Sequence, residues 1–126
     1  MSSPFDPETL NLLDETDELY IETSRDADSP DYRTIIWAVV VGDEVFMRSV
    51  RGRKGRWYQR ISAHPEGALL VGDTLIPVRA APATDAATVD AVSEAFRSKY
   101  EHAWPGPTAG IVRPEVLPTT LKLSPA

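Results

Sequence analysis

Two Gly-Asp dipeptides, each placed between two apolar segments, most strongly constrain how this chain folds. They are Gly42-Asp43 and Gly72-Asp73. A two-residue turn in which glycine supplies a positive φ joins neighbouring antiparallel strands, so each dipeptide predicts a β-hairpin. The four strands of these two hairpins are residues 33–41, 45–50, 68–71 and 75–80. Residues 33–41 are so apolar and β-branched that we expect one continuous strand, buried on both faces.

Two further segments have the residue pattern of strands. Residues 18–23 alternate between apolar and polar side chains. In residues 117–123 every second residue, Leu117, Thr119, Leu121 and Leu123, would lie on the same face of a strand. Six strands that are mostly joined by tight turns favour an antiparallel sheet, and a sheet of this size closes readily into a small barrel. The sequence therefore predicts a mainly β fold.

The remaining periodic segments predict one long and two short α-helices. Asp6-Pro7-Glu8 combines an N-cap, a proline at the first helical position and an acid in the first turn. A second short helix is expected over residues 56–63, and a long one from Thr84 or Asp85 to about His102. A chain of 126 residues suffices for one domain, with residues 1–17 as N-terminal helix and tail and 18–124 as the barrel.

Charge is distributed unevenly along the sequence. Residues 1–31 hold ten acids and one base, whereas six of the 13 Lys and Arg residues lie between Arg48 and Arg60, and the net charge is -6. An extended basic face, which nucleic-acid binding requires, is therefore not expected. A compact basic loop in an acidic protein suits one small anion or an acidic partner surface.

The basic loop is the strongest candidate for a binding site. Arg53 and Lys54 precede Gly55 at the predicted start of a helix, so backbone N–H groups and two cationic side chains could converge on one phosphate. The alternative is a solvated loop whose charges are offset by the acidic N-terminal third. In either case we expect Arg56 and Arg60, one helical turn apart, to face water.

Other residue types carry weaker signals. Trp57 suits either a packed core or a platform for ring stacking, and His64 and His102 suit helix-end capping better than catalysis. The chain has no Cys, so we expect no thiolate catalysis and no metal site. No leader opens the chain, and no apolar run approaches the roughly 20 residues that cross a bilayer. A cytoplasmic protein with no membrane partner is the expectation.

Three stretches resemble the flavin- and deazaflavin-binding proteins related to pyridoxamine 5'-phosphate oxidase. They are residues 33–37 with 45–47, the pair Arg53-Lys54 followed by 61–65, and the segment 57–65. The order of elements over residues 18–124 is similar too, most closely to an uncharacterised bacterial branch called DUF2255. The resemblance implies that the barrel is a six-stranded antiparallel split β-barrel, that it forms a homodimer, and that FMN or the deazaflavin F420 lies at the dimer seam.

The resemblance also implies roles for particular residues. Arg53 and Lys54 would hold the cofactor phosphate with Arg33 nearby, and Arg48 and Ser49 would lie beside the ribityl chain. Backbone from Ile35 through Ile36 to Trp37 would face the ring. Gly52 and His64 depart from the family pattern, which has Ser and Asn there. No general acid or base is recognisable, so catalytic residues stay unassigned.

The implied function is an FMN- or F420-dependent oxidoreductase that acts on a small organic substrate. The alternative is a cofactor-free protein of the same fold, whose basic loop binds an acidic partner or another phosphate ligand.

Overall fold

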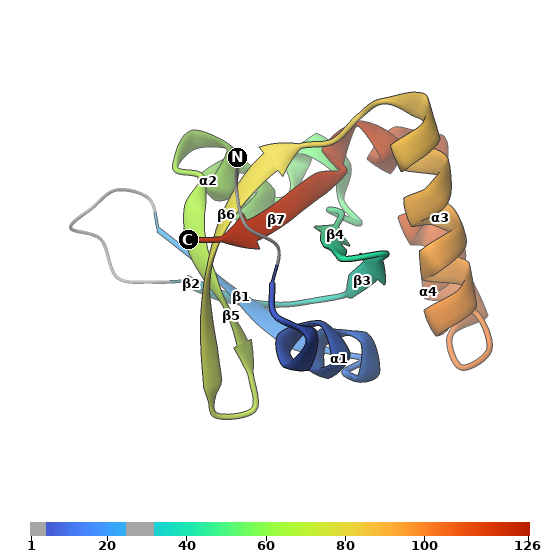
Figure 1. Cartoon of the computed structure of the whole chain (residues 1–126). Coiled ribbons are helices and arrows are strands. Elements are labelled where there is room, and N and C mark those ends of the chain that lie inside the picture. Colours follow the sequence, from blue (N-terminus) through green and yellow to red (C-terminus); the bar gives the residue numbers. More distant parts are fainter. Residues whose placement is uncertain (1–4, 25–31) are drawn as a thin grey trace.

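The computed structural model describes residues 5–24 and 32–126. Its strands are β1 (Leu19–Thr23), β2 (Tyr32–Ile36), β3 (Ala38–Val41), β4 (Glu44–Met47), β5 (Glu66–Val71), β6 (Thr74–Pro82) and β7 (Leu121–Pro125). Its α-helices are α1 (Pro7–Glu15), α2 (Arg56–Ala63), α3 (Ala86–Tyr100) and α4 (Pro105–Ile111). Two 3₁₀-helices, η1 (Gly52–Lys54) and η2 (Pro114–Thr119), complete the described elements (Figure 1).

All described strands form one antiparallel sheet in the order β2-β1-β5-β6-β7-β4-β3. Its two outermost strands, β2 and β3, are consecutive in the chain and separated by Trp37 alone. A flat sheet would hold these strands many strand spacings apart. The sheet must therefore curl until its edges approach each other, which gives the mainly β, barrel-like fold that the sequence predicts.

The prediction of one strand over residues 33–41 was wrong, and the sheet has seven strands rather than six. The chain leaves the pairing with β1 at Ile36 and joins β4 from Ala38 onward. The prediction that both faces of this segment are buried was also wrong, because Ile35 lies on the outer face of the sheet and is 55% exposed. A run of β-branched residues does not reveal which strand each half pairs with, so the break at Trp37 left no signal in the sequence.

Both Gly-Asp hairpins are confirmed. Gly42 has φ 63° at the turn between β3 and β4, and Gly72 has φ 58° between β5 and β6. Only glycine adopts this left-handed conformation without steric cost. The short helices α4 and η2, which lie between the long helix and the last strand, were not predicted, and β7 begins at Leu121 rather than Leu117.

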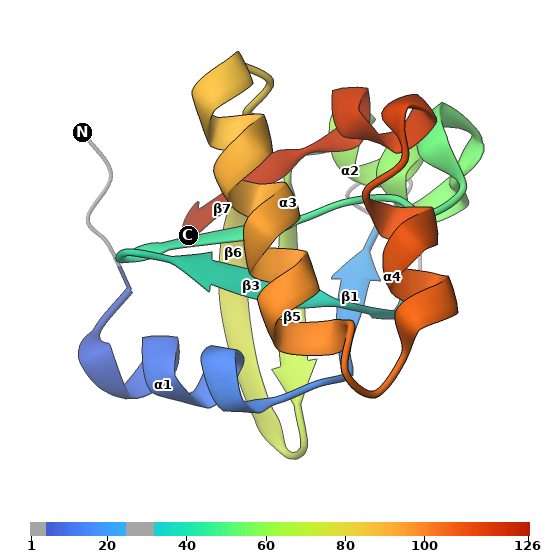
Figure 2. The ribbon, with the colours of Figure 1, turned by 90° about the vertical axis from the view of Figure 1, so that its right-hand side faces the viewer.

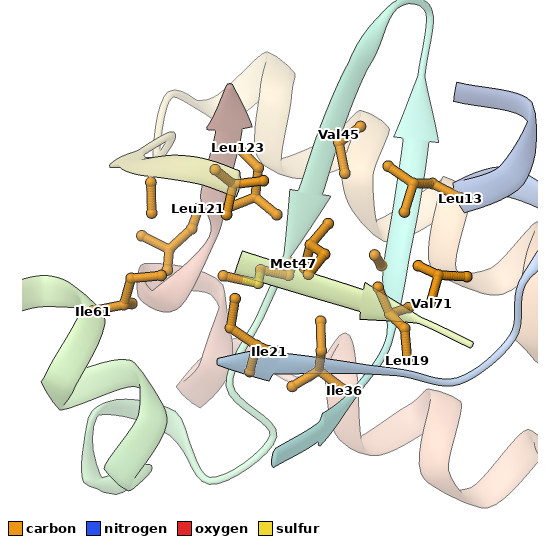
Figure 3. Close-up of a cluster of buried hydrophobic side chains, with 14 of the residues drawn as sticks. Leu13, Leu19, Ile21, Ile36, Val45, Met47, Ile61, Val71, Leu121 and Leu123 are labelled. Atoms are coloured by element: carbon orange, nitrogen blue, oxygen red, sulfur yellow. The ribbon is translucent and has the colours of Figure 1, made fainter. Parts of the chain in front are cut away.

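The main core fills the concave side of the curled sheet. Its buried side chains come from every described strand and from α1 and α2. Figure 3 shows these members of the core converging: Leu13, Leu19, Ile21, Ile36, Val45, Met47, Ile61, Val71, Leu121 and Leu123. Trp57 and Ile61 are the buried residues of α2, so this helix is fixed to the core by one face. The start of α2 is thereby held against the sheet.

Helix α3 lies across β3, with α4 beside it (Figure 2). A second buried cluster, Val39, Phe46, Val92, Phe96, Tyr100 and Ile111, joins these helices to β3 and β4. The predicted caps of α1 and α3 are confirmed: Asp6 accepts from the Thr9 N–H at 2.8 Å, and Asp85 from the Thr88 N–H at 3.1 Å. These hydrogen bonds lower the pKa of both carboxyl groups.

Candidate phosphate and ring site

A groove on the surface is lined by β2, the segment that follows β4, and the start of α2. We call it the cationic groove because its lining includes Arg33, Arg51, Arg56 and Arg60. Among the described residues that line it, none is acidic. In a chain of net charge -6, such a local excess of positive charge favours an anionic ligand.

Ser49 lies in the wall of the cationic groove and is 1% exposed. Its backbone N–H donates to Thr119 Oγ1 at 3.0 Å, but its own Oγ has no hydrogen-bond partner within the described structure. A buried hydroxyl without a partner is destabilising, so most such groups in proteins are paired. An anionic oxygen in the groove would supply the acceptor that this hydroxyl lacks.

The first turn of α2 adds backbone donors to the same place. Gly55 is the N-cap residue and offers no side-chain cap, and the first intrahelical bond runs from the Gln59 N–H to the Gly55 carbonyl at 3.0 Å. The N–H groups of the first turn therefore lack a helical acceptor, and the helix dipole makes this end positive. A helix start of this kind binds phosphate readily.

The four arginines differ in how they are engaged. Arg33 pairs with the nearly buried Glu22 carboxylate at 2.5 Å. The prediction that Arg60 faces water was wrong, because Arg60 donates to Thr23 Oγ1 at 2.7 Å and lies over the Tyr32 ring. Arg51 and Arg56 form no ion pair or hydrogen bond with any residue that the structure describes. These two are the cations open to a ligand.

Arg53 and Lys54, the residues predicted to hold the phosphate, are exposed residues of η1 and do not line the cationic groove. The Arg53 carbonyl accepts from Gln59 Nε2 at 3.1 Å. Their contact with a phosphate stays a prediction. Arg51 and Arg56, which line the groove, were not among the residues predicted to hold the phosphate. The signal available for Arg56 was its position directly after Gly55, at the expected helix start.

Arg48 was expected beside the ribityl chain, and the structure buries it. It donates from Nε to Thr120 Oγ1, from Nη1 to Ser93 Oγ and the Ile111 carbonyl, and from Nη2 to the Val89 carbonyl. These bonds join the segment that follows β4 to α3, to α4 and to Thr120, the residue before β7. Burial lowers the pKa of this guanidinium to about 10, with a smaller effect from nearby Arg97.

A second hollow adjoins the cationic groove. We call it the aromatic pocket; it has a volume of about 170 Å³ and includes Trp37, Trp57 and Ile36 in its lining. Ile35, Val50 and Trp57 line both hollows, so the two lie side by side. The predicted ring-facing residues Ile35, Ile36 and Trp37 are thus brought together at one end, and Arg33 and Ser49 at the other. Pro107 and Ile111 of α4 close the pocket and were not predicted.

Trp37 is held in place by α3. Its ring lies parallel to that of Tyr100, with centroids 3.9 Å apart and 1° between the planes. The Tyr100 hydroxyl donates to the Asp17 carbonyl at 2.6 Å, and burial raises the pKa of this phenol well above its usual range. The neighbouring Lys99 donates to the Leu13 and Ala38 carbonyls, so α3 ties α1 to the segment that follows Trp37.

Residues 9–123 match the model of a family described as "Uncharacterized protein conserved in bacteria (DUF2255)". The chain belongs to this family. A comparison with curated proteins found no match.

Three solved structures share the fold at low sequence identity. The heme storage protein HutZ from Vibrio cholerae has a TM-score of 0.68 at 12% identity, with 98% of this chain and 92% of that chain covered. A putative pyridoxamine 5'-phosphate oxidase from Listeria innocua has a TM-score of 0.61 at 11% identity, with 94% of this chain and 90% of that chain covered. An F420-H2 dependent reductase (FDR-A) has a TM-score of 0.61 at 13% identity, with 85% of this chain and 93% of that chain covered. This DUF2255 protein therefore has the split-barrel fold of the pyridoxamine 5'-phosphate oxidase-like proteins.

Other kinds of site find less support in residues 5–24 and 32–126. No group of three His, Cys, Asp or Glu side chains in these ranges is placed to hold a metal ion. No helix in the same ranges is both long and apolar enough to cross a membrane.

Proposed function

We propose that this DUF2255 protein binds FMN or the deazaflavin F420 and transfers hydride between that cofactor and a small organic substrate. The observation that carries the proposal is the unpartnered, buried Ser49 hydroxyl at the start of α2. Phosphate oxygens would accept from this hydroxyl, from the N–H groups of the first turn and from the arginines of the cationic groove.

The two hollows lie side by side, which supports a ligand with a phosphate at one end and an apolar ring at the other. Arg33, Ser49, Arg51 and Arg56 would hold the phosphate. The ring would lie against the backbone from Ile35 to Trp37, and Arg48 would contact the ligand only where it lines the aromatic pocket. Arg53 and Lys54 would act at longer range, as exposed charges near the groove.

Hydride chemistry would come from the bound ring, and the chain would supply binding, orientation and electrostatics. The helix start and the arginines stabilise negative charge at the phosphate end. The tryptophans and α4 keep water from the ring end. One of the structural neighbours is described as F420-H2 dependent, which agrees with this chemistry. We do not propose heme binding by analogy with HutZ, because no His is among the described residues that line the aromatic pocket.

We also propose that the protein is a cytoplasmic homodimer. Four outward-facing apolar side chains lie in register across β2, β1, β5 and β6: Ile35, Tyr20, Leu70 and Leu75. Ile35, Tyr20 and Leu75 are 55%, 42% and 54% exposed, an unusual row for a free surface. A second copy would cover this row. Because Ile35 also lines both hollows, the cofactor would then lie at the dimer seam.

A titration with FMN and with F420, followed by cofactor fluorescence, tests the proposal. We expect saturable binding of one of them at micromolar concentration, and an absorption spectrum of the purified protein that shows the bound ring. If neither binds, the proposal is wrong. Binding of inorganic pyrophosphate or of an acidic protein in its place would then support the alternative of a cofactor-free member of the fold.

A further inference from the structure

One charged residue in the lining of the aromatic pocket, Glu18, is not used by the proposed cofactor contacts. Glu18 immediately precedes β1, lines the pocket and is exposed. It forms no hydrogen bond or ion pair with any residue in the described parts of the chain. A ligand that enters the pocket therefore meets a carboxylate without a partner.

Arg48 is the other charged residue in the lining, but it is buried and four of its five N–H donors are already engaged. Its guanidinium, 2% exposed, donates four hydrogen bonds to Thr120, Ser93, Ile111 and Val89. The rest of the lining is apolar: Ile35, Ile36, Trp37, Val50, Trp57, Pro107 and Ile111. The pocket thus offers a mostly apolar surface in which the exposed charge, on Glu18, is negative and the buried charge, on Arg48, is positive.

The size of the pocket limits what occupies it. A dry cavity of about 150 Å³ holds one benzene molecule, and the aromatic pocket has a volume of about 170 Å³. This is room for one ring. A flavin or deazaflavin has three fused rings, so most of it would lie outside, over Ile35 and Val50, and the pocket itself would remain available to a second molecule.

We propose that the aromatic pocket binds a small organic cation: an apolar body of about one ring bearing a protonated amine. The amine would donate to the Glu18 carboxylate, and the Trp37 and Trp57 rings in the lining would add cation–π attraction. The identification of this cation as the substrate rests on the proposed function. Its binding does not depend on the proposed function, because the pocket is formed by the chain without a cofactor.

The test uses three probes of the same shape and different charge on the full, cofactor-free chain: phenethylamine, 2-phenylethanol and phenylacetate. Binding is followed by tryptophan fluorescence and by the indole N–H signals of Trp37 and Trp57 in NMR spectra. We expect phenethylamine to bind about three- to tenfold more tightly than 2-phenylethanol, as suits an exposed ion pair with some cation–π attraction. Phenylacetate should bind most weakly.

Glu18→Gln keeps the shape of the side chain and removes its charge, and should remove most of the preference for phenethylamine over 2-phenylethanol, leaving only the part that cation–π attraction supplies. Asp17→Asn is the matched control, since Asp17 is an adjacent exposed acid outside the lining of the pocket, and it should keep the preference. Tighter binding of phenylacetate, no binding of any probe, or an unchanged preference in Glu18→Gln would each overturn the proposal. Titration of the same samples with FMN and with F420 tests the proposed function independently, because binding of the amine does not require a cofactor.

Discussion

Gly55 lies directly against Ser49: a Cβ at position 55 would overlap the Ser49 Oγ. The contact forms because the chain reverses through η1 between the end of β4 and the start of α2, with Gly52 at φ 66°. It places a buried hydroxyl beside the N–H groups of the first turn of α2. The pair therefore defines the phosphate end of the proposed site.

Gly55→Ala should weaken binding of a phosphate-bearing cofactor without closing the ring end. The new methyl group would force the Ser49 hydroxyl out of its position, so we expect FMN affinity to fall about tenfold or more. Riboflavin, which has the same ring and no phosphate, serves as the matched ligand, and its affinity should not change. An equal loss for both ligands, measured by flavin fluorescence, would show that the substitution damages the fold rather than the phosphate contacts.

Arg48→Met should reduce stability strongly, because it leaves buried acceptors on α3 and α4 without a donor. Methionine retains much of the stem volume, and we expect the free energy of unfolding to fall by about 2–4 kcal/mol. Urea denaturation measures it. Arg53→Met, at an exposed position, is the control and should cost less than about 0.5 kcal/mol. If the Arg48→Met protein is stable and has lost only cofactor affinity, the result would support the contact between Arg48 and the ribityl chain that was predicted from the sequence.

Local signals in the sequence were enough to predict most of the fold. Both hairpin turns depend on a glycine followed by an acid, and the starts of α1 and α3 on Asp6 and Asp85, each of which caps its own helix. The resemblance supplied the family. What failed depends on long-range pairing: the change of partner at Trp37 moves the chain from β1 to β4, and nothing in residues 33–41 records it.

The candidate site was predicted in outline and not in its individual charges. The sequence indicated that a basic loop meets a helix start, and Ser49, Gly55 and Arg33 do lie together there. It could not show that η1 would turn Arg53 and Lys54 away while Arg51 and Arg56 line the groove, because the direction of each side chain depends on one short 3₁₀ turn. Nor could it show that Arg48 would be satisfied by α3 and α4, which are more than 40 residues distant in sequence.

Lys99 should make stability depend on pH in the alkaline range. Burial lowers its pKa from 10.5 to about 8, partly opposed by Asp14 and Asp17. Between these two pH values the unfolded chain binds more protons at this group than the folded one, so Lys99 makes the free energy of unfolding rise as pH increases from 8 toward 10.5. Urea denaturation at pH 7, 8, 9 and 10 on the parent and on Lys99→Met measures the difference. A difference independent of pH would contradict it.

Tyr20→Lys should convert the proposed dimer into a monomer. Tyr20 lies at the centre of the outward-facing row, between Ile35 and Leu70, and a charge there opposes burial against a second copy. Size-exclusion chromatography with light scattering reports the mass. Ser98→Lys, on the exposed side of α3, is the control and should leave the mass unchanged. If the parent protein is itself monomeric at high concentration, the dimer proposal is wrong.

The central claim is that the cationic groove holds a cofactor phosphate through Arg51 and Arg56, and two double variants of equal charge change test it most directly. Arg51→Ala with Arg56→Ala removes two cations that line the groove, and Arg53→Ala with Lys54→Ala removes two that do not. Titration with FMN or F420 should show affinity falling about ten- to a hundredfold in the first and less than about threefold in the second. Equal losses, or a larger loss in the second variant, would contradict the claim.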